Sequence, residues 1–242
     1  MYSEADQRNF WNKWNVSREE TQGRVSSDQQ RVVLRWLDRM GRRDLRIIEV
    51  GCGAGWLCSD LTRYGRVVGT DLSDEVLARA AERLPEAEFI AGDFLTLDLG
   101  EEQFDVVVTL ETLTHVPDQA GFVRRCSRLL KPGGLLMMAT QNKTALQRNR
   151  LAPPERGQYR RWVDRDELVE LMREDFEIEE LFSITPKFNR GPLKILNSER
   201  LHRPIRAIGL GGLVDSITRM QERAWLGWTL MALARKSERR AP

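Results

Sequence analysis

Residues 47–58 read IIEVGCGAGWLC and carry glycines at the alternating positions Gly51, Gly53 and Gly55. A β-branched run ends at the first glycine and an apolar helical pattern begins after the last one, which predicts a buried strand, a tight turn and a helix. Glycines without side chains let the backbone turn sharply and approach a ligand closely. In an open parallel sheet, ligands bind in this position at the carboxyl end of a strand.

Apolar strand segments and amphipathic helix segments alternate on both sides of this turn. We expect strands at residues 45–50, 66–70, 88–91, 104–110, 135–140, 176–184 and 226–234, and helices at residues 4–14, 27–40, 56–64, 73–84, 119–130 and 164–174. This alternation predicts an α/β fold, with a mostly parallel sheet and helices on both faces. The last two strands would form an antiparallel pair at one sheet edge, joined by an irregular basic region.

Composition excludes several classes of protein. With 242 residues, of which 41% are hydrophobic, the chain suits a single domain over residues 1–242. No apolar run approaches the roughly 20 residues that cross a bilayer, and the polar N-terminus does not resemble a signal peptide. Cys52, Cys58 and Cys126 give neither a disulfide framework nor a metal-ligand pattern. We therefore expect a cytoplasmic protein with reduced cysteines.

The net charge of +2 is unevenly distributed. Residues 187–242 carry twelve Lys or Arg against four Asp or Glu, and residues 143–161 carry six against one. These basic segments are compatible with an acidic partner or with peripheral contact to a membrane. No basic stretch is dense enough to favour nucleic acid as a partner.

Acidic residues follow the predicted strands at informative distances. Asp71 lies twenty residues after Gly51, where a carboxylate can accept hydrogen bonds from both hydroxyls of a ribose. Asp93 ends the third strand and can accept from an exocyclic amine, with Phe94 against the ring. Glu49 lies in an apolar strand and is costly there unless a donor or a positive charge meets it. A ligand with adenine, ribose and amino-acid groups would satisfy all three carboxylates.

The order of five motifs resembles the class I S-adenosylmethionine-dependent methyltransferases. These motifs are EVGCGAG (49–55), VVGTDLS (67–73), AGDF (91–94), FDVVVTLETLTHVPD (104–118) and LLKPGGLLMMAT (129–140). The resemblance is close over residues 45–142 and looser in the flanks. It implies a Rossmann-like seven-stranded sheet with an antiparallel last strand, which would make residues 226–234 the closing edge strand. It also implies S-adenosyl-L-methionine as cofactor and S-adenosyl-L-homocysteine as product.

The resemblance also implies positions for the cofactor. They are Glu49, Gly51, Cys52, Gly53 and Gly55 around the methionine part, Asp71 and Leu72 at the ribose, Asp93 and Phe94 at the adenine, and Leu110 near the sulfonium. Residues 1–44 would form an N-terminal helical lid, residues 45–142 the cofactor-binding core, and residues 143–242 the acceptor side. Trp11, in FWNKWN, resembles the aromatic lid of this family, although ordinary packing of a helix on the sheet explains it equally well.

The loop after the fourth strand contains candidate catalytic residues. His115 can act as a general base near neutral pH, or it can donate to a backbone carbonyl and only shape the loop. The sequence LETLTHVPD looks most like the loop of ubiquinone-biosynthesis O-methyltransferases. In small-RNA 3′-terminal methyltransferases a related Glu-x-x-Glu-His pattern binds a divalent metal. Thr114 replaces its second glutamate here, so we expect no metal and assign Glu111 to orienting the substrate or supporting His115.

The expected reaction is methyl transfer to a small-molecule acceptor, with a hydroxyl oxygen favoured and a quinone-like or aromatic acceptor suggested by the loop. Three alternatives stay open: an N-methyltransferase of a small molecule, an RNA or protein methyltransferase, and a cofactor-binding subunit without activity. A nicotinamide dehydrogenase is disfavoured because Trp56 stands where the third glycine of that fingerprint belongs. A monomer and a homodimer are both compatible with the sequence.

Overall fold

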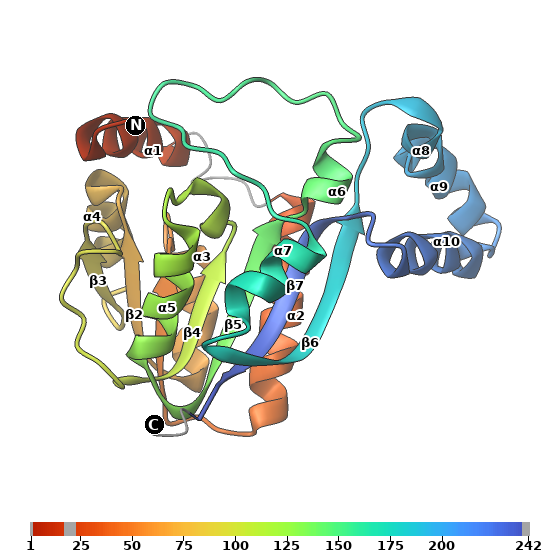
Figure 1. Cartoon of the computed structure of the whole chain (residues 1–242). Helices are drawn as coiled ribbons and strands as arrows, with labels where there is room; N and C mark the ends of the chain where they lie inside the picture. Colours follow the sequence, from red (N-terminus) through yellow and green to blue (C-terminus); the bar gives the residue numbers. More distant parts are fainter. Residues whose placement is uncertain (1, 17–22, 239–242) are drawn as a thin grey trace.

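Seven strands form one sheet in the order β3-β2-β1-β4-β5-β7-β6 (Figure 1). A computed structural model describes residues 2–16 and 23–238, apart from the side chain of Glu199. The strands are β1 Leu45–Val50, β2 Gly65–Asp71, β3 Glu88–Ala91, β4 Phe104–Leu110, β5 Leu130–Gln141, β6 Phe176–Pro186 and β7 Gly227–Lys236. Strands β1 to β5 pair in parallel, and β7 is antiparallel to both of its neighbours. The predicted mostly parallel sheet with an antiparallel last strand is confirmed.

The last strand lies inside the sheet, so the expectation of a closing edge strand at residues 226–234 is wrong. Met231 of β7 pairs with Ala139 of β5 on one side and with Phe182 of β6 on the other. Strand β7 is buried almost throughout, as suits a strand with a neighbour on each side, whereas β6 carries Glu177 and Glu179. Charged side chains are tolerated at an edge, and β6 takes that position.

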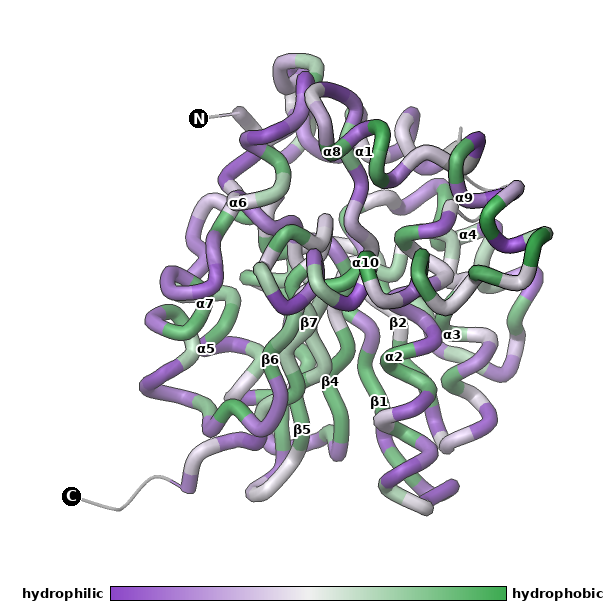
Figure 2. The backbone as a smooth tube through the Cα atoms, turned by 90° about the vertical axis from the view of Figure 1, so that its right-hand side faces the viewer, coloured by the Kyte–Doolittle hydropathy of each residue, from purple (hydrophilic) through white to green (hydrophobic). Residues whose placement is uncertain are grey.

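Helices cover both faces of the sheet, as predicted. They are α1 Glu4–Val16, α2 Arg24–Met40, α3 Trp56–Leu61, α4 Asp74–Arg83, α5 Gln119–Leu129, α6 Lys143–Leu146, α7 Arg165–Met172, α8 Gly191–Leu196, α9 Glu199–Ala207 and α10 Gly211–Arg223, with 3₁₀ turns at Thr62–Tyr64 and Leu113–His115. Trp36 of α2 packs with Ile47 on one face, and Phe122 of α5 packs with Ile48 on the other. The mainly hydrophobic strands between these layers form the core (Figure 2).

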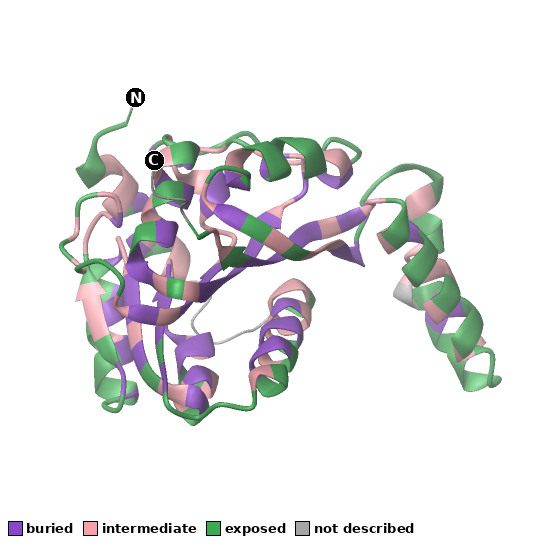
Figure 3. Ribbon diagram, turned by 60° about the horizontal axis from the view of Figure 1, so that its bottom comes forward, coloured by how far each residue is buried: buried purple, intermediate pink, exposed green. Residues whose placement is uncertain are grey.

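The expected irregular region between β6 and β7 is largely helical, and this expectation is also corrected. Helices α8, α9 and α10 stand beside the sheet rather than on its faces (Figure 3). Pro204 lies inside α9, and glycines 209, 211 and 212 interrupt the helical pattern in the sequence. Helix α10 buries only Val214 and Gln221, so it contacts the rest of the protein at few positions.

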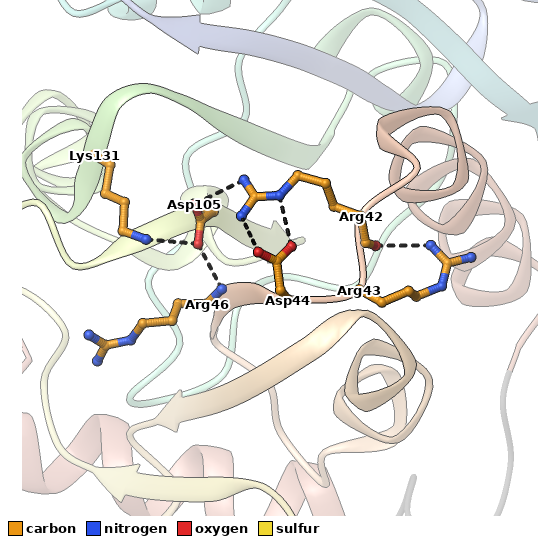
Figure 4. Close-up of polar contacts among 6 residues, drawn as sticks. All are labelled: Arg42, Arg43, Asp44, Arg46, Asp105 and Lys131. Carbon is orange, nitrogen blue, oxygen red and sulfur yellow. Dashed lines mark hydrogen bonds and ion pairs between the residues drawn. The ribbon is translucent and has the colours of Figure 1, made fainter.

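A polar network closes the amino end of the central strands (Figure 4). Asp105 accepts hydrogen bonds from the Arg46 amide at 2.8 Å, from Lys131 Nζ at 2.9 Å and from Arg42 Nη1 at 3.3 Å. Burial alone would raise the pKa of Asp105, but the Arg46 amide and the Lys131 ammonium outweigh it and hold this pKa below its usual value. The network connects β1, β4 and β5 at the amino end of the sheet. The predicted ligand site lies at the opposite, carboxyl end.

Candidate active site

The glycine turn joins the carboxyl ends of β1 and β2. The amides of Gly51 and Cys52 both donate to the Thr70 carbonyl oxygen, at 2.7 and 3.0 Å. Gly51 has φ +74°, and a Cβ atom there would lie 2.0 Å from Thr112 Oγ1, which itself donates to the Val50 carbonyl oxygen at 3.1 Å. Only glycine fits this position, because both the backbone conformation and the space exclude a side chain.

Asp71, at the end of β2, is held by backbone amides. Its Oδ2 accepts from the Gly53 amide and its Oδ1 from the Ser73 amide, both at 2.8 Å, with the half-buried Leu72 between them. Burial raises the pKa of Asp71, against the opposing effect of the Ser73 and Gly53 amides. Each oxygen keeps a further lone pair, so the fixed carboxylate can accept from two neighbouring hydroxyls.

Glu49 is a buried carboxyl group without a charged partner among the described residues. It is 4% exposed, and the Cys58 thiol donates to its Oε2 at 3.0 Å. Burial raises the pKa of Glu49 to about 7, and burial raises the pKa of the neighbouring Cys52 thiol to about 11. A thiol is a weak donor, so an ammonium group of a ligand would relieve an unfavourable burial. The two carboxylates of Glu49 and Asp71, which accept hydrogen bonds, and the glycine turn between them fit S-adenosylmethionine.

The next acidic residue follows β3. Asp93 Oδ1 accepts from the Leu95 amide at 2.9 Å, while the Gly92 amide donates to the Asp71 carbonyl oxygen at 3.0 Å and brings this turn beside β2. Phe94 is 8% exposed, and its ring packs on Phe122 with 5.1 Å between centroids. The expected contact of Phe94 with an adenine ring therefore stays a prediction.

Helix α1 lies across the carboxyl end of the sheet (Figure 1). Asn12 donates to Asp74 at 3.0 Å, and Asn15 donates to Ser73 Oγ at 2.8 Å, which fixes α1 at the start of α4. Residues 1 and 17–22 of the predicted lid lie outside the described residues. Sequence reasoning missed both asparagines, which directly follow Trp11 and Trp14 in FWNKWN.

His115 lies on the 3₁₀ turn after β4. Its Nδ1 donates to the Tyr159 carbonyl oxygen at 2.8 Å, and its ring centroid is 4.6 Å from that of Trp11. Because a carbonyl oxygen can only accept, the proton of the neutral ring is on Nδ1 and the lone pair on Nε2. Nε2 has no hydrogen-bond partner among the described residues. Burial lowers the pKa of His115 to about 4, with a smaller contribution from Arg160.

Glu111 begins the same loop in a strained conformation. Its φ of +63° is rare for a residue with a side chain, and such strain is typical of functional sites. The Glu111 carboxylate accepts hydrogen bonds from Gln29 and, at 3.0 Å, from Thr229 Oγ1. Leu110, just before it, accepts a hydrogen bond from Thr112 Oγ1 at 3.4 Å through its carbonyl oxygen. Sequence reasoning missed Gln29, whose signal is an amide on the apolar face of α2.

Most of the predicted site residues lie together at the carboxyl end of the sheet. The carboxyl ends of three adjacent strands carry Glu49, the glycine turn, Asp71 and Glu111. The ring of Trp11 lies against that of His115, with 4.6 Å between their centroids. Within residues 143–242, the predicted acceptor side, Lys187 Nζ lies 5.3 Å from the centroid of the Trp228 ring. In the described part of the chain, no group of three or more His, Cys, Asp or Glu is arranged to hold a metal ion.

Comparison with known proteins gives consistent matches. Residues 48–138 match a family model described as a methyltransferase domain. A ubiquinone biosynthesis O-methyltransferase of Bradyrhizobium sp. is 40% identical over 104 residues, which are 41% of this chain and 41% of that protein. The match thus spans about two fifths of that relative. A protein of the same name from Thiobacillus denitrificans is 35% identical over 172 residues, which are 63% of this chain and 73% of that protein.

Solved structures share the fold. An S-adenosylmethionine-dependent methyltransferase from Mesorhizobium loti has a TM-score of 0.60 at 24% identity, with 83% of this chain and 96% of that chain covered. An N-methyltransferase from Bradyrhizobium japonicum, solved with S-adenosyl-L-homocysteine, has a TM-score of 0.64 at 15% identity, with 94% and 99% covered. The solved structures agree in fold, and the methyltransferase-domain match and the Thiobacillus denitrificans relative, of which this chain covers 73%, show that the chain belongs to the S-adenosylmethionine-dependent methyltransferases.

Proposed function

We propose that this chain transfers the methyl group of S-adenosylmethionine to a hydroxyl oxygen of a small aromatic acceptor. One observation carries the proposal: the hydrogen bond from His115 Nδ1 to the Tyr159 carbonyl oxygen leaves the Nε2 lone pair available beside the lid residue Trp11. A hydroxyl must lose its proton as its oxygen is methylated, and a positioned base supplies that step.

Three carboxylates would hold the cofactor. Glu49 pairs with the ammonium group, Asp71 accepts from the ribose hydroxyls, and Asp93 accepts from the adenine amine. When bound, the cofactor supplies a methyl group on a positively charged sulfur. The amides that fix both oxygens of Asp71 position this carboxylate before binding, which reduces the entropy lost on binding.

His115 would take the proton of the acceptor at Nε2. Burial keeps the imidazole neutral at pH 7, so its lone pair is present throughout the neutral range, and the same lowered pKa makes it a weaker base than a free imidazole. The imidazolium that forms on proton transfer lies 4.6 Å from the Trp11 ring, and an aromatic ring favours a nearby cation. Glu111, fixed by Gln29 and Thr229, would orient the acceptor.

Two observations support a hydroxyl on an aromatic ring as the acceptor group. The curated relatives matched over the core are named as O-methyltransferases of ubiquinone biosynthesis. The acceptor-side segments supply Trp162, whose Nε1 donates to Gln141 Oε1 at 2.8 Å, and Trp228 beside Lys187. Flat rings stack favourably on such indoles.

Transfer of label from methyl-tritiated S-adenosylmethionine tests the proposal. The protein is incubated with a panel of phenols and catechols, a matched panel of amines, and bulk RNA and protein, each with and without EDTA. We expect label in the extracted phenolic products and the same rate with EDTA. No turnover of any phenol would refute the proposal. Label in amines, RNA or protein alone would favour the corresponding alternative, and abolition by EDTA would restore a metal at Glu111 and His115.

A further inference from the structure

Helices α8, α9 and α10 form a projection, here called the arm, which comprises residues 191–223. Figure 3 shows the arm standing away from the sheet with most of its surface exposed. Among the described residues, the large apolar side chains that are at least 36% exposed lie in the arm with two exceptions, Tyr2 and Val169. Ile208 is 72% exposed and Met220 is 69% exposed. Soluble monomers rarely gather exposed apolar side chains in this way unless the surface binds something.

The outer end of the arm is apolar and uncharged. Residues 207–214 read AIGLGGLV and run from the end of α9 through the turn at residues 208–210 into the start of α10; this segment is here called the apolar turn. Ile208, Leu210 and Leu213 on this turn are each more than half exposed. The inner end of α10 is attached to the sheet, because Ser183 Oγ of β6 donates to the Glu222 carbonyl oxygen at 2.8 Å. A helix of 13 residues is about 20 Å long, so the turn lies far from the sheet.

Positive charge surrounds this apolar turn. The arm carries six Lys or Arg against three Asp or Glu. Arg206 pairs with Asp215 at 2.6 Å and neutralises the acidic residue nearest to the turn. Arg200 and Arg203 are exposed, and neither has an acidic partner among the described side chains. In Figure 2 hydrophobic and hydrophilic stretches alternate along α9, which places both kinds of surface at the same end of the molecule.

We propose that the arm binds this chain to the surface of a membrane that contains anionic lipids. The side chains of Ile208, Leu210 and Leu213 enter the lipid between the headgroups, while Arg200 and Arg203 contact the phosphates. Apolar insertion combined with basic residues is how peripheral proteins bind such surfaces. A second copy of this chain fits less well, because it would bring an equally positive arm against this one. The described residues include no helix that is long and apolar enough to span a bilayer, so contact would be peripheral.

The position of the arm connects this surface to the candidate site. The arm leaves the sheet after β6 and returns at β7, and Thr229 of β7 contacts Glu111. A membrane bound by the arm would therefore lie next to the predicted acceptor side, residues 143–242. Binding to the membrane itself does not depend on the proposed methyl transfer.

Co-sedimentation with lipid vesicles tests the inference on the full chain. Vesicles of phosphatidylcholine alone are compared with vesicles that contain about 30% phosphatidylglycerol, at low and at high salt. One variant combines Ile208→Ser, Leu210→Ser and Leu213→Ser, and another combines Arg200→Gln and Arg203→Gln. Matched controls are Val169→Ser on α7 and the pair Arg124→Gln and Arg128→Gln on α5, all at exposed positions.

We expect the wild-type chain to bind anionic vesicles at least about tenfold more tightly than neutral ones, and less tightly at high salt. Each arm variant should lower binding to anionic vesicles about tenfold or more, while the controls stay within about twofold of wild type. Circular dichroism checks that each variant is folded. If the serine variant does not fold, vesicle binding by the variant with Arg200→Gln and Arg203→Gln decides the test. Equal binding to both vesicle types, or control variants as weak as the arm variants, would overturn the inference. A dimer that the serine variant abolishes, without vesicle binding, would overturn it in favour of a second copy.

Discussion

Gln29 of α2 donates a hydrogen bond to the carboxylate of Glu111, 82 residues later in the chain. The same amide donates to Thr229 Oγ1 at 2.9 Å, and Thr229 donates to Glu111 at 3.0 Å. Gln29 is 1% exposed and Thr229 is fully buried, so these three side chains form a largely buried polar group that links α2, the loop after β4, and β7. The group holds Glu111 in a backbone conformation that a non-glycine residue seldom adopts.

Replacing Gln29 with leucine should destabilise the fold. The variant Gln29→Leu keeps the side-chain volume but removes both donated hydrogen bonds and leaves Glu111 and Thr229 partly unsatisfied. We expect the free energy of unfolding to fall by about 1–3 kcal/mol, measured by urea denaturation. Gln103→Leu is the control, because Gln103 bonds to Arg46 and Glu101 near the surface. A loss no greater than that of the control would show that the buried group contributes nothing.

Replacing Gly51, at the start of the turn, should lower the free energy of unfolding by more than the strain of a positive φ alone explains. Gly51→Ala places a Cβ atom 2.0 Å from Thr112 Oγ1 at φ +74°. Gly133→Ala has almost the same φ, +73°, but meets no atom within 4 Å. The control should cost about 1–2 kcal/mol in unfolding free energy, from backbone strain alone. Gly51→Ala should cost more and weaken cofactor binding; equal losses in the two variants would contradict this account of the turn.

The carboxylate at the end of β2 should contribute to cofactor affinity. In Asp71→Ala two charge-assisted hydrogen bonds to a ribose are lost, and we expect binding of S-adenosylmethionine to weaken by about 1–3 kcal/mol. Isothermal titration calorimetry measures the dissociation constant directly. Asp166→Ala, at an exposed position on α7, should leave the constant unchanged. Affinity preserved in Asp71→Ala would refute the ribose assignment.

The network at the amino end of the sheet predicts a pH dependence of stability. The pKa of Asp105 is lowered in the folded state, so its stabilising contribution is fully present above its ordinary pKa and is lost as the pH falls through the folded value. Asp105→Asn should reduce the free energy of unfolding at pH 7 by about 1–2 kcal/mol. As the pH is lowered, urea denaturation should show a shrinking difference in the free energy of unfolding between Asp105→Asn and wild type.

The neighbouring Asp44 provides the control for this dependence. Its side chain is 75% exposed and pairs with Arg42 in the same network. Exposed ion pairs contribute little, so Asp44→Asn should leave the free energy of unfolding close to that of wild type at either pH. A gap between Asp105→Asn and wild type that is the same at pH 7 and in acid would mean that the carboxylate charge is not what stabilises this end of the sheet.

The sequence predicted the elements with strong local patterns. Strand β1 and the glycine turn were correct because a buried β-branched run and three glycines leave few alternatives. The position of β7 was wrong because strand order depends on pairing between distant segments, and only the charges on β6 indicate which strand is at the edge. Helices α8 to α10 were missed because Pro204 lies inside α9 and glycines 209, 211 and 212 stand at the junction with α10, where such residues are typical of loops.

For the candidate site, the sequence indicated single residues better than their partners. Asp71 and His115 were chosen as candidates from spacing and residue type, and their roles stay predictions. Their contacts to Gly53 and Tyr159 depend on where the loops lie. The sequence offered a choice for His115 between a base and a donor to a carbonyl. The two ring nitrogens make these roles compatible, since Nδ1 donates and Nε2 is left to accept.

The turnover of His115→Ala decides whether His115 acts as the general base. The preferred phenol is used at saturating concentration, and His202→Ala, which replaces the other histidine of the chain, is the control. We predict that kcat falls by about 10²–10⁴-fold in His115→Ala, while the dissociation constant for S-adenosylmethionine stays unchanged and the control keeps wild-type turnover. A kcat within about twofold of wild type would contradict the account and make His115 a residue that only shapes its loop.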